Sequence, residues 1–558
     1  MLLSVVITLV NLSWVLRDNA APSWDQSHYL YLTWVYQQAL DHHGPGALVH
    51  AIYTTDPSHA PLLSVLLVPL SYIFGPGTGV GLALNLILWP IFLLSAGAIA
   101  REFFDDRARL LAIVLLAPMP LIVTLSHQVL QDFLLVTLTT VAVLLLVRSH
   151  RFTGRKASLG LGLAVGAGLL TKFSFFVGFA GPALVTLIAC VADCVTSRRL
   201  DGDWRAARRP ITNMVLAASV AVIPTLLWYV PNWTATVAYI KTQFSGQGGA
   251  TFDPLSPVHL AAFFVNTGAN MSWLAVGTAV IVAMISIPRL SRWFLGHRVR
   301  RAAVLRAAVL RAAFLGSWLF IPIVVVAADI NQDPRYLVAS YPALAVITGG
   351  LISQITRPIV RRVMVSAVVI ATAVQILQVN VPHYRTPLLP ASINFHTPGG
   401  WISIPFRAGD GPAVVPAPTN VTLEILQYLE SQSRRPDRRI KAAIVLLPEL
   451  EPTANGNDLS YYAAIRHDPF TFVTAGSTET KKQLTATLQD SNFVLYVRQP
   501  SLTTGAGINA ISQLNQSDVA RQMTPAMFAL FSPHPKHIYI GADSPQSPYL
   551  AVLERRET

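Results

Sequence analysis

Ionisable side chains interrupt a mostly apolar sequence at five places, and these residues are the first candidates for chemistry. Asp25 closely follows the first apolar stretch, where a carboxylate can act as a general base toward an acceptor hydroxyl or amine, or can bind a metal ion. Aspartate is also a common helix cap, and a helical pattern runs from here toward Ala39. Both roles stay open for Asp25.

A second carboxylate, Asp132, opens an apolar helix directly after a polar turn that begins at Ser126. Carboxylates from two loops can share a divalent cation such as Mg²⁺ or Mn²⁺, or can divide the roles of base and metal ligand. Asp25 and Asp132 are therefore the candidate catalytic residues and the candidate metal ligands. The alternative is that Asp132 only complements the positive end of its helix dipole.

Three cationic or titratable side chains complete the set. Lys172 interrupts a long apolar stretch, where it either extends its stem toward water or neutralises a phosphate. Arg335 lies in a short polar segment, and its planar guanidinium suits a phosphate, although Asp333 is a competing partner. His59 comes just before a proline-initiated apolar helix, where it either contacts an anion at the helix N-terminus or caps the helix.

The elements that position these residues are membrane spans. The chain has 558 residues, of which 53% are hydrophobic and only 12% are charged, whereas soluble domains have roughly a quarter of their residues charged. Its apolar stretches approach or reach the ~20 residues that cross a bilayer. Met1–Leu16 lacks a basic start and a cleavage site, so we expect an uncleaved first span, although a short one. The eleven predicted spans are 1–16, 79–100, 109–125, 130–147, 158–171, 174–196, 211–230, 263–287, 312–328, 337–355 and 362–379.

The net charge of +13 does not indicate nucleic-acid binding, because the basic residues gather in short gaps between apolar stretches. Five gaps hold 22 of the 41 Lys and Arg residues but only 5 of the 28 acids. Such loops are typically cytoplasmic. All five gaps face the cytoplasm only if the short apolar run 61–74 does not cross, so we predict a re-entrant or interfacial helix there. The gaps are 101–109, 148–156, 198–209, 289–311 and 357–362.

The C-terminal part of the chain changes character. Short strand-like runs alternate with helical patterns, which predicts a small α/β domain with a substantially parallel sheet. We therefore expect a mainly α, polytopic transmembrane helical bundle with a C-terminal extracytoplasmic α/β domain. The predicted domains are a transmembrane module over 1–380 with a first external loop over 17–78, a linker over 381–411 and the α/β domain over 412–558.

The ordered set of polar motifs resembles the GT-C superfamily of integral-membrane glycosyltransferases, in particular the family 39 branch of protein O-mannosyltransferases and aminoarabinose transferases. The likeness covers most of the chain, but each motif is short. The matching elements are Asp25, His59-Ala-Pro61-Leu62, Asp132, Leu169-Leu-Thr-Lys172, Pro334-Arg-Tyr-Leu337 with Pro342-Ala, and the outer-domain segments Leu446-Leu-Pro448-Glu, Asn455-Gly-Asn457 and Leu459-Ser-Tyr461-Tyr462.

The resemblance implies a multi-pass protein of the plasma membrane that transfers a sugar from a polyprenyl-phosphate-linked donor to an extracytoplasmic acceptor, a glycan, lipid or protein, with inversion. It gives Asp25 the role of base, and it makes Lys172, Arg335, His59 and Tyr336 the residues that bind the donor phosphate. Relatives often carry a second acid where Gln26 stands here, so the resemblance leaves a metal open.

Two other classes of protein compete with this interpretation. A secondary transporter typically has repeated span patterns and charges at mid-membrane depth, whereas no clear duplication is visible here and the ionisable groups are predicted at one face. A membrane-anchored binding protein would explain the outer domain but not the ionisable groups in five loops. The transferase is therefore the favoured prediction.

Overall fold

A computed structural model of the chain describes residues 2–16, 22, 25–201, 204–244, 253–295, 302–329, 332–380, 392–397, 400–405, 421–432, 440–445, 456–475, 492–498, 531–533, 538–539 and 549–555. The chain divides into two compact units. The helical unit comprises Met1–Asp18, Val49–Leu70 and Gly79–Val414, and the α/β unit comprises Asn19–Leu48, Ser71–Thr78 and Val415–Thr558.

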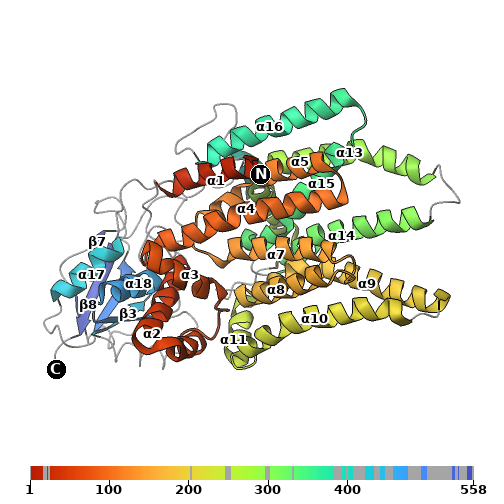
Figure 1. The fold of residues 1–558 in the computed structure, drawn as a ribbon. Helices are drawn as coiled ribbons and strands as arrows, with labels where there is room; N and C mark the ends of the chain where they lie inside the picture. The colour runs from red at the N-terminus through yellow and green to blue at the C-terminus, as the bar shows by residue number, and fades with distance from the viewer. Residues whose placement is uncertain are drawn as a thin grey trace. The chain divides into compact units, whose positions relative to one another are not determined.

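The helical unit is a bundle of long helices that run side by side (Figure 1). Two further helices, α2 (Asp25–Thr54) and α3 (Leu62–Phe74), contain residues of both units, and α2 is interrupted at Gly44, whose φ is 79°. The elements of the bundle are α1 (Leu2–Val15), α4 (Thr78–Phe103), α5 (Asp106–Leu116), α6 (Pro120–Ser126), α7 (Gln131–Arg148), α8 (Arg155–Thr171), α9 (Phe175–Asp201), α10 (Trp204–Tyr229), α11 (Trp233–Phe244), α12 (Pro257–Met271), α13 (Trp273–Leu295), α14 (Ala302–Ala327), the 3₁₀ helix η1 (Pro334–Ser340), α15 (Tyr341–Ser353) and α16 (Pro358–Asn380).

The prediction of a polytopic helical bundle is confirmed. Among the described residues, seven segments are long and apolar enough to cross a membrane, and two bent helix pairs raise the number to nine. The predicted span 109–125 is one of these pairs, α5 and α6, bent by 69°. The bend falls where Pro120 starts α6, because proline has no N–H to continue the hydrogen bonds of α5. These nine segments account for nine of the eleven predicted spans. The remaining two, 1–16 and 158–171, correspond to the shorter helices α1 and α8, which have 14 and 17 residues.

The described helix ends beside the five basic gaps gather at one end of the helical unit, and we call this the basic end. Side-chain and backbone contacts connect these helix ends or the described residues next to them, and Figure 1 shows the helix ends at the same side of the bundle. The connecting contacts are Arg148 with Glu102 at 3.2 Å, Arg151 and Arg306 with Asp193, Asn213 with the carbonyl oxygen of Phe152 at 2.7 Å, and Gly350 against Phe104. A common end is what the charge pattern predicts.

Helices α1 and α4 both reach the opposite end of the helical unit. Asn11 of α1 donates to Ser126 Oγ at 3.0 Å, and Asn85 of α4 donates to the backbone oxygens of Ser126 and Gln128 at 3.1 and 2.8 Å. The chain therefore leaves α1 and enters α4 at the same end. This agrees with the prediction that the apolar run 61–74, which forms the 13-residue helix α3, does not change sides.

Small residues bring α8 and α10 into close contact along their length. A Cβ added at Gly162 would lie 2.4 Å from the carbonyl oxygen of Ala217, and one added at Gly166 would lie 3.2 Å from that of Ala221. Glycine and alanine four residues apart are the usual means of close helix approach in membranes. At the far end of the pair, the Tyr229 hydroxyl donates to the carbonyl oxygen of Leu169 at 2.8 Å. The two helices thus hold the C-terminal turn of α8 in place.

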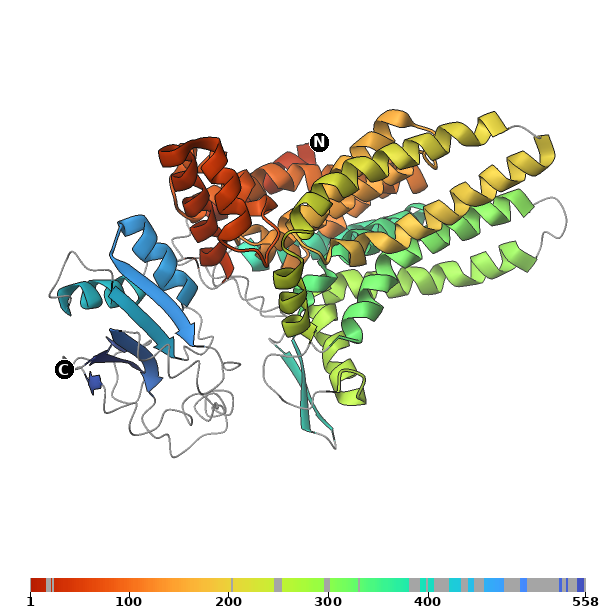
Figure 2. The same ribbon diagram turned by 90° about the horizontal axis from the view of Figure 1, so that it is seen from below.

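The α/β unit contains a mixed sheet with the strand order β4-β3-β5-β8-β6, in which β7 also pairs with β8 (Figure 2). Two helices of its C-terminal part are described, α17 and α18, and they agree with the expected helical patterns between strands. The bounds are β3 (Ile440–Val445), β4 (Phe470–Ala475), β5 (Phe493–Arg498), β6 (Phe531–Pro533), β7 (Ile538–Tyr539), β8 (Tyr549–Arg555), α17 (Val421–Gln432) and α18 (Gly456–Arg466).

Only part of this sheet is parallel, which limits the prediction of a substantially parallel sheet. Strands β4, β3 and β5 are parallel, and α18 forms the crossover between β3 and β4. Strands β5, β6 and β7 each pair antiparallel with β8. A separate antiparallel hairpin of β1 (Ser392–Thr397) and β2 (Gly400–Pro405) lies in the range predicted as a linker.

Candidate active site

The candidate site in the helical unit is built around an ion pair that lies away from the basic end. Lys172 Nζ lies 2.9 Å from Asp132 Oδ1, and the two side chains are only 14% and 3% exposed. Asp132 stands in the first turn of α7, and Lys172 is the residue that ends α8. Among the described residues, this pair is the only polar side-chain contact of Asp132. Two candidates separated by 40 residues in the sequence thus form one buried charge pair.

The ion pair is extended by an aromatic side chain from a third element. Lys172 Nζ lies 4.8 Å from the centre of the Tyr336 ring, a distance at which a cation is attracted to the ring face. Tyr336 belongs to η1, which packs against α7, α9 and α14. The structure therefore brings together Asp132, Lys172 and Tyr336, and we call these three residues the charge cluster.

Arg335 stands next to the charge cluster in the sequence, and its own geometry is set by Asp333. One Asp333 carboxylate oxygen accepts from the backbone N–H of Arg335 at 2.9 Å, and the other lies 2.8 Å from Arg335 Nε. Asp333 is thus the N-cap of η1 and the ion-pair partner of its first arginine. The competing partner that the sequence indicated is present, and it fixes the orientation of a half-buried guanidinium.

Two close backbone approaches position η1 and the end of α8. A Cβ added at Gly178 of α9 would lie 2.4 Å from the Cβ of Ala339 in η1, so η1 packs directly on the α9 backbone. A Cβ added at Gly168 would lie 2.2 Å from the ring of Phe175. Because glycine stands at both points, the helices approach closely enough for Lys172 to reach both Asp132 and Tyr336.

His59 occupies a separate hydrogen-bonded turn before α3. Its Nδ1 lies 2.7 Å from Asp56 Oδ2, while the other Asp56 oxygen accepts from the backbone N–H of Ser58 at 3.0 Å. The ring centre of His59 lies 4.4 Å from that of Tyr239 in α11. The turn is connected to the charge cluster through α7, because Gln131 donates to the carbonyl oxygen of Ala60 at 3.1 Å. His59 is therefore held beside the helix that carries Asp132.

The structure adds two residues that the sequence did not single out, Asn11 and Asn85. Both are buried, and both bond the turn between α6 and α7 that precedes Asp132. His127 of this turn is also buried, and its Nε2 is hydrogen-bonded to Asn11 Oδ1. Both residues could have been noticed in the sequence, since each is a lone asparagine inside a predicted span. Polar groups inside a membrane segment are costly unless they are paired, which indicates a buried partner.

The buried His127 gives a prediction for pH dependence. Burial lowers the pKa of His127 from 6.5 to about 3, so the folded protein holds the ring neutral. The unfolded chain takes up a proton at this ring near pH 6.5. The contribution of the neutral His127 ring to the free energy of unfolding is therefore fully present above about pH 6.5. It falls as the pH drops from there toward 3. We expect the melting temperature to fall between pH 7 and pH 5, and to fall less in a His127→Gln variant. An equal fall in both proteins would contradict the assignment.

Asp25 belongs to the α/β unit, so its position relative to the charge cluster is not defined. It starts α2, whose first turn is anchored within its own unit: Ser27 Oγ donates to Asp458 Oδ1 at 2.5 Å, and both side chains are buried. Asp458 lies in α18, and a second residue of α18, Tyr461, donates to the carbonyl oxygen of Pro76. Parts of the predicted first external loop therefore pack with the C-terminal α/β domain.

The surroundings of Asp132 do not suit a divalent cation. Mg²⁺ and Mn²⁺ prefer several oxygen ligands, whereas the polar partner of this carboxylate is an ammonium group at 2.9 Å. No second carboxylate of the described helical unit contacts Asp132. The suggestion that Asp25 and Asp132 share a metal ion thus stays a prediction.

Comparisons with known proteins agree with this architecture. Residues 58–229 match the family model described as "Dolichyl-phosphate-mannose-protein mannosyltransferase". The matched segment contains His59, Asp132 and Lys172, and it ends at the last residue of α10. No curated protein matches the chain at a significant level.

Three solved structures share the fold over nearly the whole chain. ArnT from Cupriavidus metallidurans in the apo state is 15% identical, with a TM-score of 0.53, over 99% of this chain and 97% of that one. AglB, an archaeal oligosaccharyltransferase from Archaeoglobus fulgidus, is 12% identical, with a TM-score of 0.53, over 98% of this chain and 73% of that one. The mycobacterial arabinofuranosyltransferase AftD is 11% identical, with a TM-score of 0.52, and this chain spans only 40% of its length.

The three structures are glycosyltransferases of the GT-C fold, and the family model that matches residues 58–229 describes a glycosyltransferase of the same kind. The chain therefore has the fold of these membrane glycosyltransferases, and its residues 58–229 match the model of a mannosyltransferase family. The resemblance seen in the polar motifs is confirmed by fold and family match.

Proposed function

We propose that the chain transfers a sugar from a polyprenyl-phosphate-linked donor to an acceptor on the extracytoplasmic face of the membrane, with inversion at the anomeric carbon. The observation that carries the proposal is the charge cluster of Asp132, Lys172 and Tyr336. Asp132 and Lys172 lie in the segment 58–229, whose family is named after a dolichyl-phosphate sugar donor. Structures of the same fold bind the corresponding carriers: ArnT has been solved with undecaprenyl phosphate and AglB with a dolichol-phosphate.

The proposed reaction is a single displacement. The acceptor oxygen or nitrogen attacks the anomeric carbon, the bond from that carbon to the phosphate oxygen breaks, and the polyprenyl phosphate leaves with the bonding electron pair. The proton of the acceptor passes to a carboxylate base. One displacement inverts the anomeric centre, so the proposal includes inversion as a consequence of its mechanism.

Lys172 is suited to stabilise the phosphate as charge develops on it. An ammonium group has three N–H donors, and one of them is used on Asp132. The Asp132 carboxylate and the Tyr336 ring fix the direction of the ammonium before the donor arrives, and such preorganised charges need no rearrangement during the reaction. We assign Asp132 the role of positioning Lys172, since its carboxylate is already engaged.

Arg335 supplies a second cation in the same manner. Its guanidinium is oriented by Asp333, and η1 connects it directly to Tyr336 of the charge cluster. Each cation is thus balanced by one acid, so the site carries little net charge before the donor binds. We infer that the phosphate is recognised by directed hydrogen bonds rather than by a large excess of positive charge.

Asp25 is the proposed base. It stands at the start of α2, in the external loop of the predicted topology, and its carboxylate is not the partner of Lys172. The positive-inside rule supports an extracytoplasmic location of the charge cluster, because the cluster lies away from the basic end. His59, next to α7, is a further candidate for the donor phosphate.

The proposal predicts that the phosphate of the lipid carrier dominates recognition. The purified protein should bind polyprenyl phosphate about tenfold more tightly than the matching polyprenol, a difference that one charge-assisted hydrogen bond can supply. An Arg335→Gln variant should lose most of this preference, whereas Arg361→Gln at the basic end should keep it. Equal affinity for the two lipids, or equal loss in both variants, would reject the assignment of the phosphate site.

A further inference from the structure

The basic end of the helical unit contains a hollow that the proposed function does not use. It has a volume of about 430 Å³ and lies between the N-terminal parts of α8 and α10. This volume is in the range of clefts that bind small molecules. Three guanidinium groups converge there beside a hydroxyl and an amide. The lining residues are Arg155, Arg208, Arg209, Thr212, Asn213 and Leu216.

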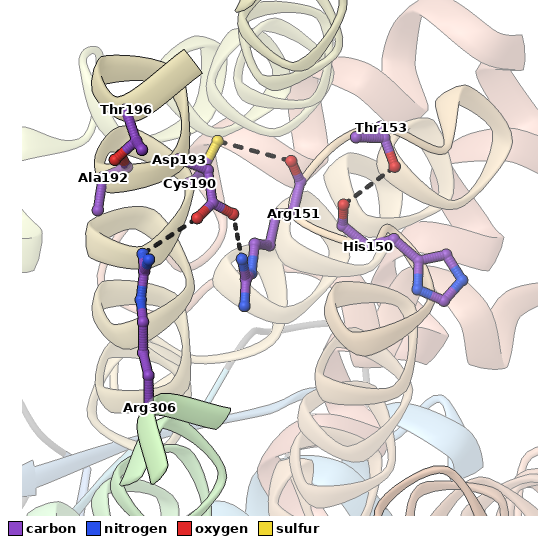
Figure 3. Close-up of polar contacts among 8 residues, drawn as sticks. All are labelled: His150, Arg151, Thr153, Cys190, Ala192, Asp193, Thr196 and Arg306. Atoms are coloured by element: carbon purple, nitrogen blue, oxygen red, sulfur yellow. Dashed lines mark hydrogen bonds and ion pairs between the residues drawn. The ribbon is translucent and has the colours of Figure 1, made fainter. Parts of the chain in front are cut away.

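The three arginines of the hollow lack the acidic partners that neighbouring arginines have. Arg151 and Arg306 both contact the carboxylate of Asp193, as Figure 3 shows. Within the described part of the chain, by contrast, Arg155, Arg208 and Arg209 form no ion pair. The side chains of Asp201 and Asp203 in the same loop lie outside the described residues. The described part of the hollow therefore carries three uncompensated positive charges.

The floor of the hollow is rigidly built. Asn213 is only 4% exposed, and its Nδ2 donates to the carbonyl oxygens of Phe152 and Thr153 at 2.7 and 3.4 Å. It thereby fixes the turn between α7 and α8, in which three successive residues have positive φ angles of 47°, 57° and 66°. Residues other than glycine rarely adopt this conformation. Because Arg155 follows this turn directly, its place at the start of α8 is fixed relative to α10.

The outer face of α10 continues from the hollow as an apolar stripe. Arg208 and Thr212 are followed at helical spacing by Val215, Val222 and Leu226, which are 55%, 45% and 52% exposed. The opposite face of α10 packs on α8 through alanine and glycine. A helix that exposes valine and leucine in a membrane protein faces acyl chains. The hollow therefore opens at the junction between cationic groups and a lipid-facing surface.

We propose that this hollow binds a phosphate-bearing anion, and that its source is the head group of an anionic phospholipid whose acyl chains lie along α10. Three guanidinium groups suit the phosphate, because their N–H donors match its oxygens. Basic pockets between membrane helices on the cytoplasmic side commonly take such head groups. The site lies at the opposite end of α8 from Lys172, about 25 Å away for a helix of this length.

The test compares two matched arginine pairs in detergent-purified full-length protein. Arg208 and Arg209 line the hollow near the start of α10, whereas Arg361 and Arg362 stand at the same end near the start of α16. Thermal unfolding is measured against added phosphatidylglycerol and phosphatidylcholine. We expect phosphatidylglycerol to stabilise the wild type, with an apparent affinity about thirtyfold weaker in R208Q/R209Q. R361Q/R362Q should behave like the wild type.

Further measurements decide the source of the phosphate and protect against misfolding. Inorganic phosphate and glycerol 1-phosphate are added in place of the lipid; stabilisation by either, dependent on Arg208 and Arg209, would overturn the lipid source. Equal stabilisation of wild type and R208Q/R209Q by phosphatidylglycerol, or equal loss in both double variants, would overturn the site itself. If R208Q/R209Q does not fold, Arg155→Gln replaces it. The wild type should then be stabilised more by phosphatidylglycerol than by phosphatidylcholine, and Arg155→Gln should weaken this preference; an unchanged preference would overturn the site.

Discussion

Replacing Lys172 with methionine is expected to lower the rate of sugar transfer by about 10²- to 10³-fold, the usual cost of removing one preorganised group that stabilises transition-state charge. The same change leaves the Asp132 carboxylate buried without its partner. Breaking a buried ion pair from one side typically costs about 3–5 kcal/mol of folding free energy. Lys172→Met should therefore lower both the transfer rate and the melting temperature.

A second variant separates these two effects. The double variant Asp132→Asn/Lys172→Met removes both charges, so most of the stability should return while the transfer activity stays low. Lys156→Met is the matched control, because Lys156 is an exposed lysine in the first turn of the same helix. Transfer activity that returns together with stability in the double variant would show that Lys172 acts only by holding the fold.

Replacing Asp25 with asparagine is expected to lower the transfer rate by about 10²- to 10⁴-fold, the contribution of a general base. Asparagine keeps the size and the side-chain carbonyl oxygen of aspartate in the first turn of α2, so the start of this helix should be kept. The melting temperature should therefore change little while the activity is lost. Steady-state rates with the folded, purified variant check this, and the loss should appear in kcat rather than in KM.

Asp41→Asn is the control for Asp25→Asn. Asp41 lies in the same helix and accepts a hydrogen bond from the Tyr72 hydroxyl at 2.5 Å, which an asparagine oxygen can also accept. The change in charge is the same, but no role in proton transfer is proposed. If both variants keep full activity, Asp25 is a helix cap and the base must be sought elsewhere.

The sequence was sufficient for the membrane architecture because charge and apolar length act locally. The basic gaps predicted one common end, and the short length of the run 61–74 predicted a helix that does not cross. Contacts such as Arg148 with Glu102 and Asn85 with the turn at Ser126 agree with both predictions. The polar motifs were also sufficient to indicate the superfamily.

The sequence could not show which side chains meet. Asp132 and Lys172 are separated by 40 residues, and only the packing of α7 on α8 brings them to 2.9 Å. The antiparallel half of the C-terminal sheet also depends on non-local pairing, because β5 pairs with the distant strand β8. The sequence also did not predict the hydrogen bond between Asn11 and His127, because the two residues are remote from each other in the chain.

The central claim is that the chain uses a polyprenyl-phosphate-linked sugar as its donor. The most direct measurement incubates the purified protein in lipid nanodiscs with radiolabelled polyprenyl-phosphate sugars and follows the polyprenyl phosphate that is released. We expect release from at least one donor by the wild type and by Lys156→Met, and a strong reduction in Asp25→Asn and Lys172→Met. No release from any donor, or release that both active-site variants leave unchanged, would contradict the account.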